Sequence, residues 1–173
     1  YQTGTFHYGD GAAKLRELID ALESTYCGSI GAEYMHIVDA REQLWVQQRL
    51  ESARGKPQFD ADLKQRILER LIAAEGLEKY LHRRYPGTKR FGLEGGESLI
   101  PMLHELFQRL GTHGIRESVI AMAHRGRLSV LVNVLGKNPG DLFDEFDGRV
   151  LSESGSGDVK YHQGFSSNMM TPG

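Results

Sequence analysis

The chain has 173 residues, of which 39% are hydrophobic and 25% charged, so it is long enough for a domain with its own core and has the composition of an ordinary globular protein. Its formal net charge of −2 and its pI of about 6.4 argue against nucleic acid or an anionic membrane surface as general partners. No apolar run approaches the ~20 residues needed to cross a bilayer, and the single cysteine, Cys27, excludes an intrachain disulfide.

The first half of the chain predicts three helices, within residues 10–28, 39–52 and 59–87. In the first and third segments, apolar residues recur at the i, i+3, i+4, i+7 spacing of an amphipathic helix. The second segment begins with Asp39 as a helix N-cap and has Glu42 three positions later, which is a capping-box pattern. The third segment ends at a Pro-Gly pair, because proline cannot donate to the helical hydrogen-bond ladder.

The second half of the chain changes character. Residues 95–111 predict a helix, and residues 117–123, "ESVIAMA", form an apolar run typical of a buried strand. Two further helices are predicted over residues 127–136 and 138–146; the second starts with Asn138 as N-cap and a proline in its first turn. The order helix, strand, loop, helix favours an α/β unit with a parallel sheet.

We expect a domain boundary near Pro86. Residues 1–86 form a helical region, and residues 87–173 form the opening, truncated part of an α/β domain with a parallel sheet. The polar opening without an initial methionine, and the tail "SSNMMTPG" without a terminating signal, predict that the chain is an excerpt of a longer protein.

The strongest candidate site is the sequence His124-Arg125-Gly126-Arg127, which follows the predicted strand. Ligands of α/β proteins gather outside the carboxyl ends of the strands. The two guanidiniums suit phosphate or carboxylate, the glycine permits close approach of a ligand, and His124 suits proton transfer. The structural alternative is that both arginines pair with carboxylates and the histidine bonds a backbone carbonyl.

Two weaker candidates lie on either side of this motif. Residues 89–103, "KRFGLEGGESLIPML", can present backbone N–H groups to an anion, or the glycines can simply form a tight turn. Residues 155–168, "GSGDVKYHQGFSSN", gather Asp158, Lys160, Tyr161 and His162. A further alternative is a metal site from Asp158 and His162, which together with His124 would indicate a small metallohydrolase.

Five blocks together carry a resemblance to a known family: "YCGSIGAEYMHI", "KRFGLEGGESLIPML", "AMAHRGRLSVLVNVLGK", "DLFDEF" and "GSGDVKYHQGFSS". In this order, from about Tyr26 to Ser167, they resemble the thiamine-diphosphate-dependent first (E1) component of the 2-oxoglutarate dehydrogenase complex. The resemblance implies a thiamine-diphosphate-binding, transketolase-like α/β fold that works as a homodimer in the citric acid cycle. It also implies Mg²⁺, a bacterial cytoplasmic location with the mitochondrial matrix as alternative, and no membrane or nucleic-acid partner.

The implied activity is oxidative decarboxylation of 2-oxoglutarate, with transfer of the succinyl group to the lipoyl arm of the second component, a dihydrolipoyl succinyltransferase. By this resemblance His124 and His162 match catalytic histidines, and Arg125 matches an arginine at the cofactor. The family's metal ligands, and the glutamate that activates the cofactor, are expected beyond Gly173, so no metal ligand is assigned here. We therefore expect this chain alone to be inactive. The alternative is a non-catalytic anion-binding or docking module on the same scaffold.

Overall fold

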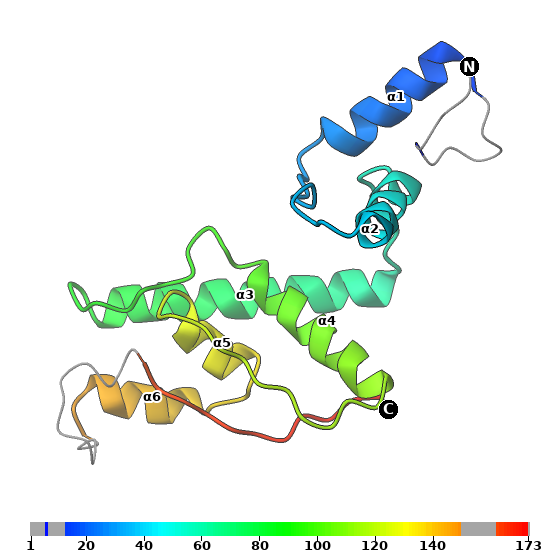
Figure 1. Cartoon of the computed structure of the whole chain (residues 1–173). Coiled ribbons are helices and arrows are strands. Elements are labelled where there is room, and N and C mark those ends of the chain that lie inside the picture. The colour runs from blue at the N-terminus through cyan, green and yellow to red at the C-terminus, as the bar shows by residue number, and fades with distance from the viewer. Residues whose placement is uncertain (1–5, 7–12, 150–161, 173) are drawn as a thin grey trace. The chain divides into compact units, whose positions relative to one another are not determined.

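The computed structural model describes residue 6, residues 13–149 and residues 162–172, and this part of the chain consists of α-helices joined by loops (Figure 1). No helix among the described residues is long and apolar enough to cross a membrane. The helices, in chain order, are α1 (Leu15–Tyr26), α2 (Ala40–Ala53), α3 (Ala61–Arg84), α4 (Leu99–Thr112), α5 (Arg127–Asn133) and α6 (Pro139–Phe146).

The predicted parallel sheet is wrong for the described part of the chain, which contains no strand. Residues 117–123, the predicted strand, run as a loop between α4 and α5, and Val119 is 96% exposed. The physical reason is that a strand needs a neighbouring segment to complete its hydrogen bonds, and no described segment supplies one. An apolar run therefore indicates a strand only where a neighbouring segment can complete its hydrogen bonds.

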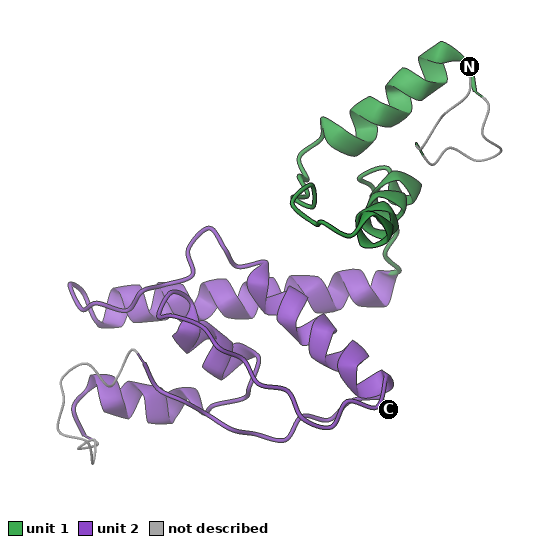
Figure 2. Cartoon of the chain, viewed as in Figure 1, with its two compact units in different colours: residues 1–60 green, residues 61–173 purple. Residues whose placement is uncertain are grey.

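The chain divides into two compact units, residues 1–60 and residues 61–173 (Figure 2). In the second unit, α3 packs against α4 and α5, which come after Pro86 in the sequence. The division between the units therefore falls inside the predicted helical region of residues 1–86. The boundary near Pro86, which concerns where a cofactor domain begins in a complete protein, stays a prediction.

The first unit is held together by the contact between α1 and α2. Its most buried polar side chain is Glu51, which is 1% exposed and accepts hydrogen bonds from the Tyr26 hydroxyl (2.6 Å) and from Gln47 Nε2 (2.8 Å). Burial, followed by the hydrogen bond to the Glu51 carboxylate, raises the pKa of Tyr26. The Tyr26 hydroxyl therefore stays protonated and acts as the donor.

The helix starts predicted at Asp39 and Asn138 are confirmed. Asp39 Oδ1 accepts a hydrogen bond from the backbone N–H of Arg41 (2.8 Å), and Asn138 Oδ1 accepts one from Gly140 (2.8 Å). The N–H groups at the start of α2 lower the pKa of Asp39. Both caps involve residues only two positions apart, which is why sequence alone predicts them.

The core of the second unit lies where α3, α4 and α5 meet. Its buried side chains are Ala74, Leu93, Ile100, Val130 and Val134. Leu93 belongs to the loop between α3 and α4, so the core fixes that loop as well as the helices. Because α5 begins at Arg127, the last residue of the His124–Arg127 motif, the same core also fixes the position of the candidate site.

Candidate functional site

The motif His124–Arg127 forms a tight turn at the start of α5. The backbone N–H of Arg127 donates to the His124 carbonyl (3.1 Å), and the N–H of Gly126 donates to the carbonyl of Phe91 (2.9 Å). Gly126 has a left-handed φ of 73°, which glycine adopts without steric cost. A Cβ atom at this position would lie 2.5 Å from Leu93 Cδ1. The glycine thus permits close approach of a core leucine, where the sequence had suggested close approach of a ligand.

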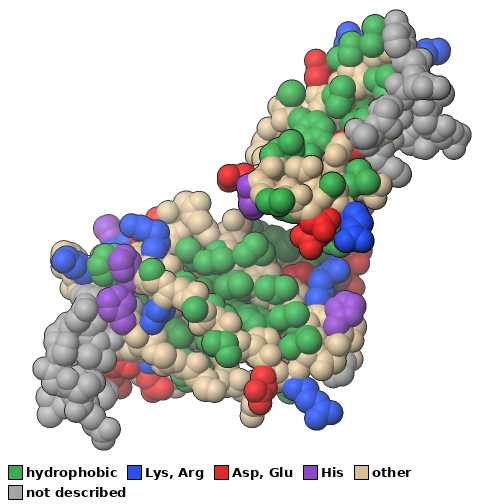
Figure 3. All heavy atoms as spheres, in the orientation of Figure 1, with side chains coloured by type: hydrophobic (Ala, Val, Ile, Leu, Met, Phe, Trp, Pro, Cys, Tyr) green, Lys and Arg blue, Asp and Glu red, His purple; other side chains and the backbone are tan. Residues whose placement is uncertain are grey.

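The structure brings the two sequence-predicted histidines together. The ring centroids of His124 and His162 are 5.8 Å apart with an interplanar angle of 40°. His124 is half-buried, whereas His162 is exposed. On the face seen in Figure 3, histidine and basic side chains lie next to one another at the end of this unit where α3 ends. Two imidazoles at this separation can act on one bound molecule.

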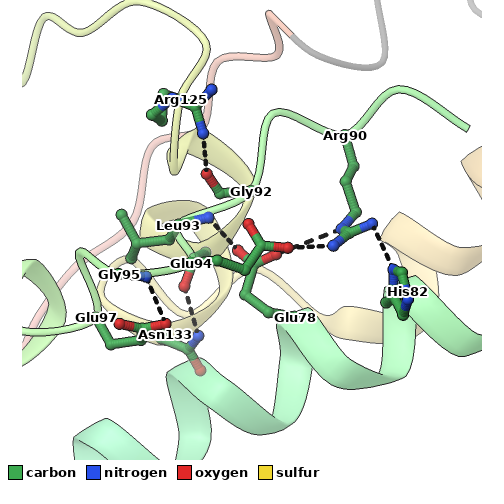
Figure 4. A network of polar contacts seen from close by, with 11 residues as sticks. Glu78, His82, Arg90, Gly92, Leu93, Glu94, Gly95, Glu97, Arg125 and Asn133 are labelled. Carbon is green, nitrogen blue, oxygen red and sulfur yellow. Dashed lines mark hydrogen bonds and ion pairs between the residues drawn. The ribbon is translucent and has the colours of Figure 1, made fainter.

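Phe91 is a site residue that the sequence analysis did not single out. Its ring centroid lies 4.0 Å from that of His124, and its backbone has a left-handed φ of 46°. A non-glycine residue in that region is uncommon and persists only where its surroundings hold it. The loop that carries Phe91 is tied to the turn a second time, because Arg125 Nη1 donates to the Gly92 carbonyl (3.1 Å; Figure 4).

A buried carboxylate anchors this loop to α3. Glu78 is 5% exposed; its Oε1 accepts a hydrogen bond from the backbone N–H of Leu93 (2.9 Å), and its Oε2 lies 3.6 Å from Arg90 Nε. Arg90 also pairs with Glu94, and its Nη1 lies 3.3 Å from His82 Nδ1, which must accept because a guanidinium only donates (Figure 4). The network joins the end of α3 to residues 90–94.

Burial raises the pKa of the Glu78 carboxyl and is the largest influence on it. The nearby Glu94 also raises this pKa, whereas the Leu93 N–H and Arg90 lower it. A carboxyl with a raised pKa in the folded protein binds its proton more tightly there than in the unfolded chain. The protonated Glu78 carboxyl therefore stabilises the folded protein at pH values below the ordinary glutamate pKa. This stabilisation is lost as the pH rises through the raised pKa of Glu78.

We predict that Glu78→Gln lowers the free energy of unfolding at pH 7 by about 1 kcal/mol, because the amide oxygen still accepts from Leu93 and Arg90 keeps its ion pair with Glu94, although its contact with Glu78 Oε2 is lost. Glu78→Ala should cost about 1–3 kcal/mol, since a buried backbone N–H loses its acceptor. Urea unfolding of the 173-residue chain between pH 4 and 8 measures both, and Glu78→Gln should also flatten the pH dependence. Glu75→Gln, in an exposed pair with Lys79, is the control. Equal losses in both Glu78 variants would contradict the prediction.

In the segment of residues 89–103, three backbone N–H groups of the glycine-rich turn already have acceptors within the chain. The N–H of Leu93 donates to Glu78, that of Gly95 to Glu97 Oε1 (3.0 Å), and that of Gly96 to the Leu93 carbonyl (2.7 Å). The glycine pair therefore forms a tight turn before α4, as in the structural interpretation of this segment.

The two arginines of the motif have different surroundings. Arg125 is exposed, and its contact with Gly92 uses one N–H of the guanidinium. Arg127 is half-buried and donates to backbone carbonyls, including that of His162 (2.9 Å). Of these two arginines, Arg125 is the more exposed and has fewer hydrogen bonds to the chain, so it is the stronger candidate for binding an anion. No sequence signal distinguishes these two arginines, because one of the carbonyls that Arg127 contacts, that of His162, lies 35 positions away in the sequence.

The third sequence candidate is only partly described. Asp158, Lys160 and Tyr161 lie outside the described residues, and His162 is the first described residue after them. A metal site from Asp158 and His162 therefore also lies outside the described part. Among the residues that the structure does describe, no group of three or more His, Cys, Asp or Glu side chains is placed to hold a metal ion.

Comparison with known proteins confirms the resemblance. The 2-oxoglutarate dehydrogenase E1 component of Azotobacter vinelandii is 62% identical over 173 residues, which is 100% of this chain and 18% of that protein. The protein of the same name from Cupriavidus necator is 52% identical over the same share of both chains. That from Haemophilus influenzae is 51% identical over 155 residues, or 90% of this chain and 16% of the relative. The chain thus spans less than a fifth of these relatives, and no protein-family model matches it.

Proposed function

Since the chain belongs, as one segment, to the family of 2-oxoglutarate dehydrogenase E1 components, we propose that the complete protein decarboxylates 2-oxoglutarate oxidatively. The succinyl group is then transferred to the lipoyl arm of a dihydrolipoyl succinyltransferase, the second component of the complex. We further propose a homodimer in the bacterial cytoplasm; the relatives compared above are bacterial. The observation that supports this proposal most directly is the proximity of His124 and His162, with ring centroids 5.8 Å apart, next to an arginine-bearing turn.

The residues around the turn fit thiamine diphosphate as an anionic cofactor. When bound, this group supplies the electron sink for the loss of carbon dioxide. The exposed guanidinium of Arg125 matches the geometry of phosphate oxygens and is the residue that we propose to hold the cofactor. The Mg²⁺ that accompanies a diphosphate prefers oxygen ligands, which we propose to lie beyond residue 173.

The two histidines bind and orient the substrate and handle its protons. The substrate 2-oxoglutarate carries two carboxylates and a keto oxygen, all of which accept hydrogen bonds. We propose that one imidazole serves the reacting centre, as donor to the developing negative charge or as proton carrier, and that the other binds the distant carboxylate. Phe91 against the His124 ring limits that ring's orientation and excludes water from one side of it.

The test is 2-oxoglutarate-dependent reduction of ferricyanide, with thiamine diphosphate and Mg²⁺ added. The complete protein should turn over, whereas the 173-residue chain alone should be silent because the metal ligands and the activating glutamate lie outside it. Turnover by the short chain alone would show that those groups are dispensable or already within it.

The alternative, a non-catalytic anion-binding or docking module, uses the same Arg125 and histidines without chemistry. It is favoured if the complete protein binds 2-oxoglutarate in calorimetry yet reduces no ferricyanide. A Gly-Asp pair followed by asparagines downstream of residue 173 would favour the enzyme.

A further inference from the structure

We infer that Arg127 is a positioning residue, whose guanidinium holds the backbone that carries His162 against the turn that carries His124. This inference rests on the proposed function, in which both imidazoles act on one substrate. It gives Arg127 a role different from anion binding, which is what its place in the His124–Arg127 motif first suggested.

The contacts of Arg127 join two segments far apart in the sequence. On one side, its Nε donates to the Ala123 carbonyl (2.9 Å) and its Nη2 donates to the Met122 carbonyl. On the other side, its Nη1 donates to the carbonyls of His162 (2.9 Å) and Gln163 (3.3 Å). One guanidinium therefore contacts the residues directly before one histidine and the backbone of the other histidine.

The geometry requires arginine in particular. A guanidinium is planar and points its N–H groups in fixed directions, so it can bridge carbonyls on opposite sides. A lysine ammonium is a compact charge on a flexible stem and cannot reach both segments at once. Arg127 is also the first residue of α5, where Leu128, Val130 and Leu131 are buried. The guanidinium is thus attached to a rigid part of the core.

Lys137 supports the same segment from the other end of α5. Its side chain is 11% exposed, and its Nζ contacts Gln163 Oε1 and lies 3.0 Å from Glu145 Oε1. Residues 162–163 are therefore held by two cations, Arg127 through their backbone and Lys137 through the Gln163 side chain. Displacing a reacting group by about 1 Å can lower a rate on the order of 100-fold, so a looser segment is expected to affect turnover strongly.

The test uses Arg127→Lys in the complete protein, with Arg109→Lys as control. Arg109 is a 69% exposed arginine of the same unit, paired with Glu105. We expect Arg127→Lys to lower kcat by roughly 10–100-fold with little change in KM for 2-oxoglutarate, because positioning and not charge is lost. Hydrogen–deuterium exchange should become faster in peptides that cover residues 162–172. Arg109→Lys should change neither the rate nor the exchange.

Two results would overturn the inference: normal kcat in Arg127→Lys, whatever its exchange, or a loss of kcat with exchange of residues 162–172 unchanged. The last would mean that Arg127 acts directly through its charge. If Arg127→Lys fails to fold, Lys137→Met provides the second variant, since it loosens the same segment, and unchanged exchange and kcat there would count against the inference. Failure of the proposed function is distinguishable, because the unsubstituted protein would then reduce no ferricyanide, or His124→Ala and His162→Ala would turn over normally, while the exchange data would still test the contact.

Discussion

Alanine at His124, or at His162, should lower the rate of the proposed 2-oxoglutarate decarboxylation by the complete protein by a factor on the order of 10²–10⁴, the usual contribution of one positioned acid, base or donor. The two rings lie 5.8 Å apart, so each can reach the same bound substrate.

Steady-state ferricyanide reduction measures this effect, and thermal unfolding verifies the fold. The fold should persist in both variants, since His162 is exposed and His124 is only half-buried. His113→Ala is the matched control, because His113 is an exposed histidine of the same unit just after α4. Near-normal turnover in both His124→Ala and His162→Ala would remove these residues from the proposed site.

The second large effect concerns Gly126, where alanine should destabilise the second unit by about 3 kcal/mol. Part of this cost is the left-handed backbone conformation, about 1–2 kcal/mol for a residue with a Cβ. The rest is overpacking, about 1–3 kcal/mol, because the new methyl group would lie 2.5 Å from Leu93 Cδ1 and Leu93 is buried in the core. For a chain of this size the melting temperature should fall by roughly 6–12 °C.

Gly95→Ala is the control that separates the two causes. Gly95 also has a left-handed φ, of 85°, but a Cβ there would meet nothing within 4 Å. Its replacement should therefore show only the backbone cost, about 1–2 kcal/mol. Equal melting temperatures for Gly95→Ala and Gly126→Ala would mean that Leu93 moves aside without cost, and that the packing argument at Gly126 is wrong.

Whether a sequence prediction proved correct depended on how far apart in the sequence the interacting residues lie. A helix bonds residues four apart, and its caps bond residues two or three apart, so the helices and the caps at Asp39 and Asn138 were predictable. The strand predicted at residues 117–123 was wrong because a strand is completed by a distant segment, which periodicity cannot supply. The resemblance to 2-oxoglutarate dehydrogenase E1 components was predictable because it rests on blocks of the linear chain, which can be compared whatever the folded shape.

In the candidate site, too, the sequence determined some features and only the tertiary structure decided the others. Sequence by itself determined which residue types stand in the motif at 124–127 and at position 162, and it determined the similarity to 2-oxoglutarate dehydrogenase E1 components. Only the tertiary structure decided that Gly126 packs on Leu93, that Phe91 lies against His124, and that Arg127 bonds carbonyls of both histidine-bearing segments. Apart from the local contact of Arg127 with Ala123, these contacts join residues more than 30 positions apart, and chain closure over such distances depends on the whole core rather than on any local pattern.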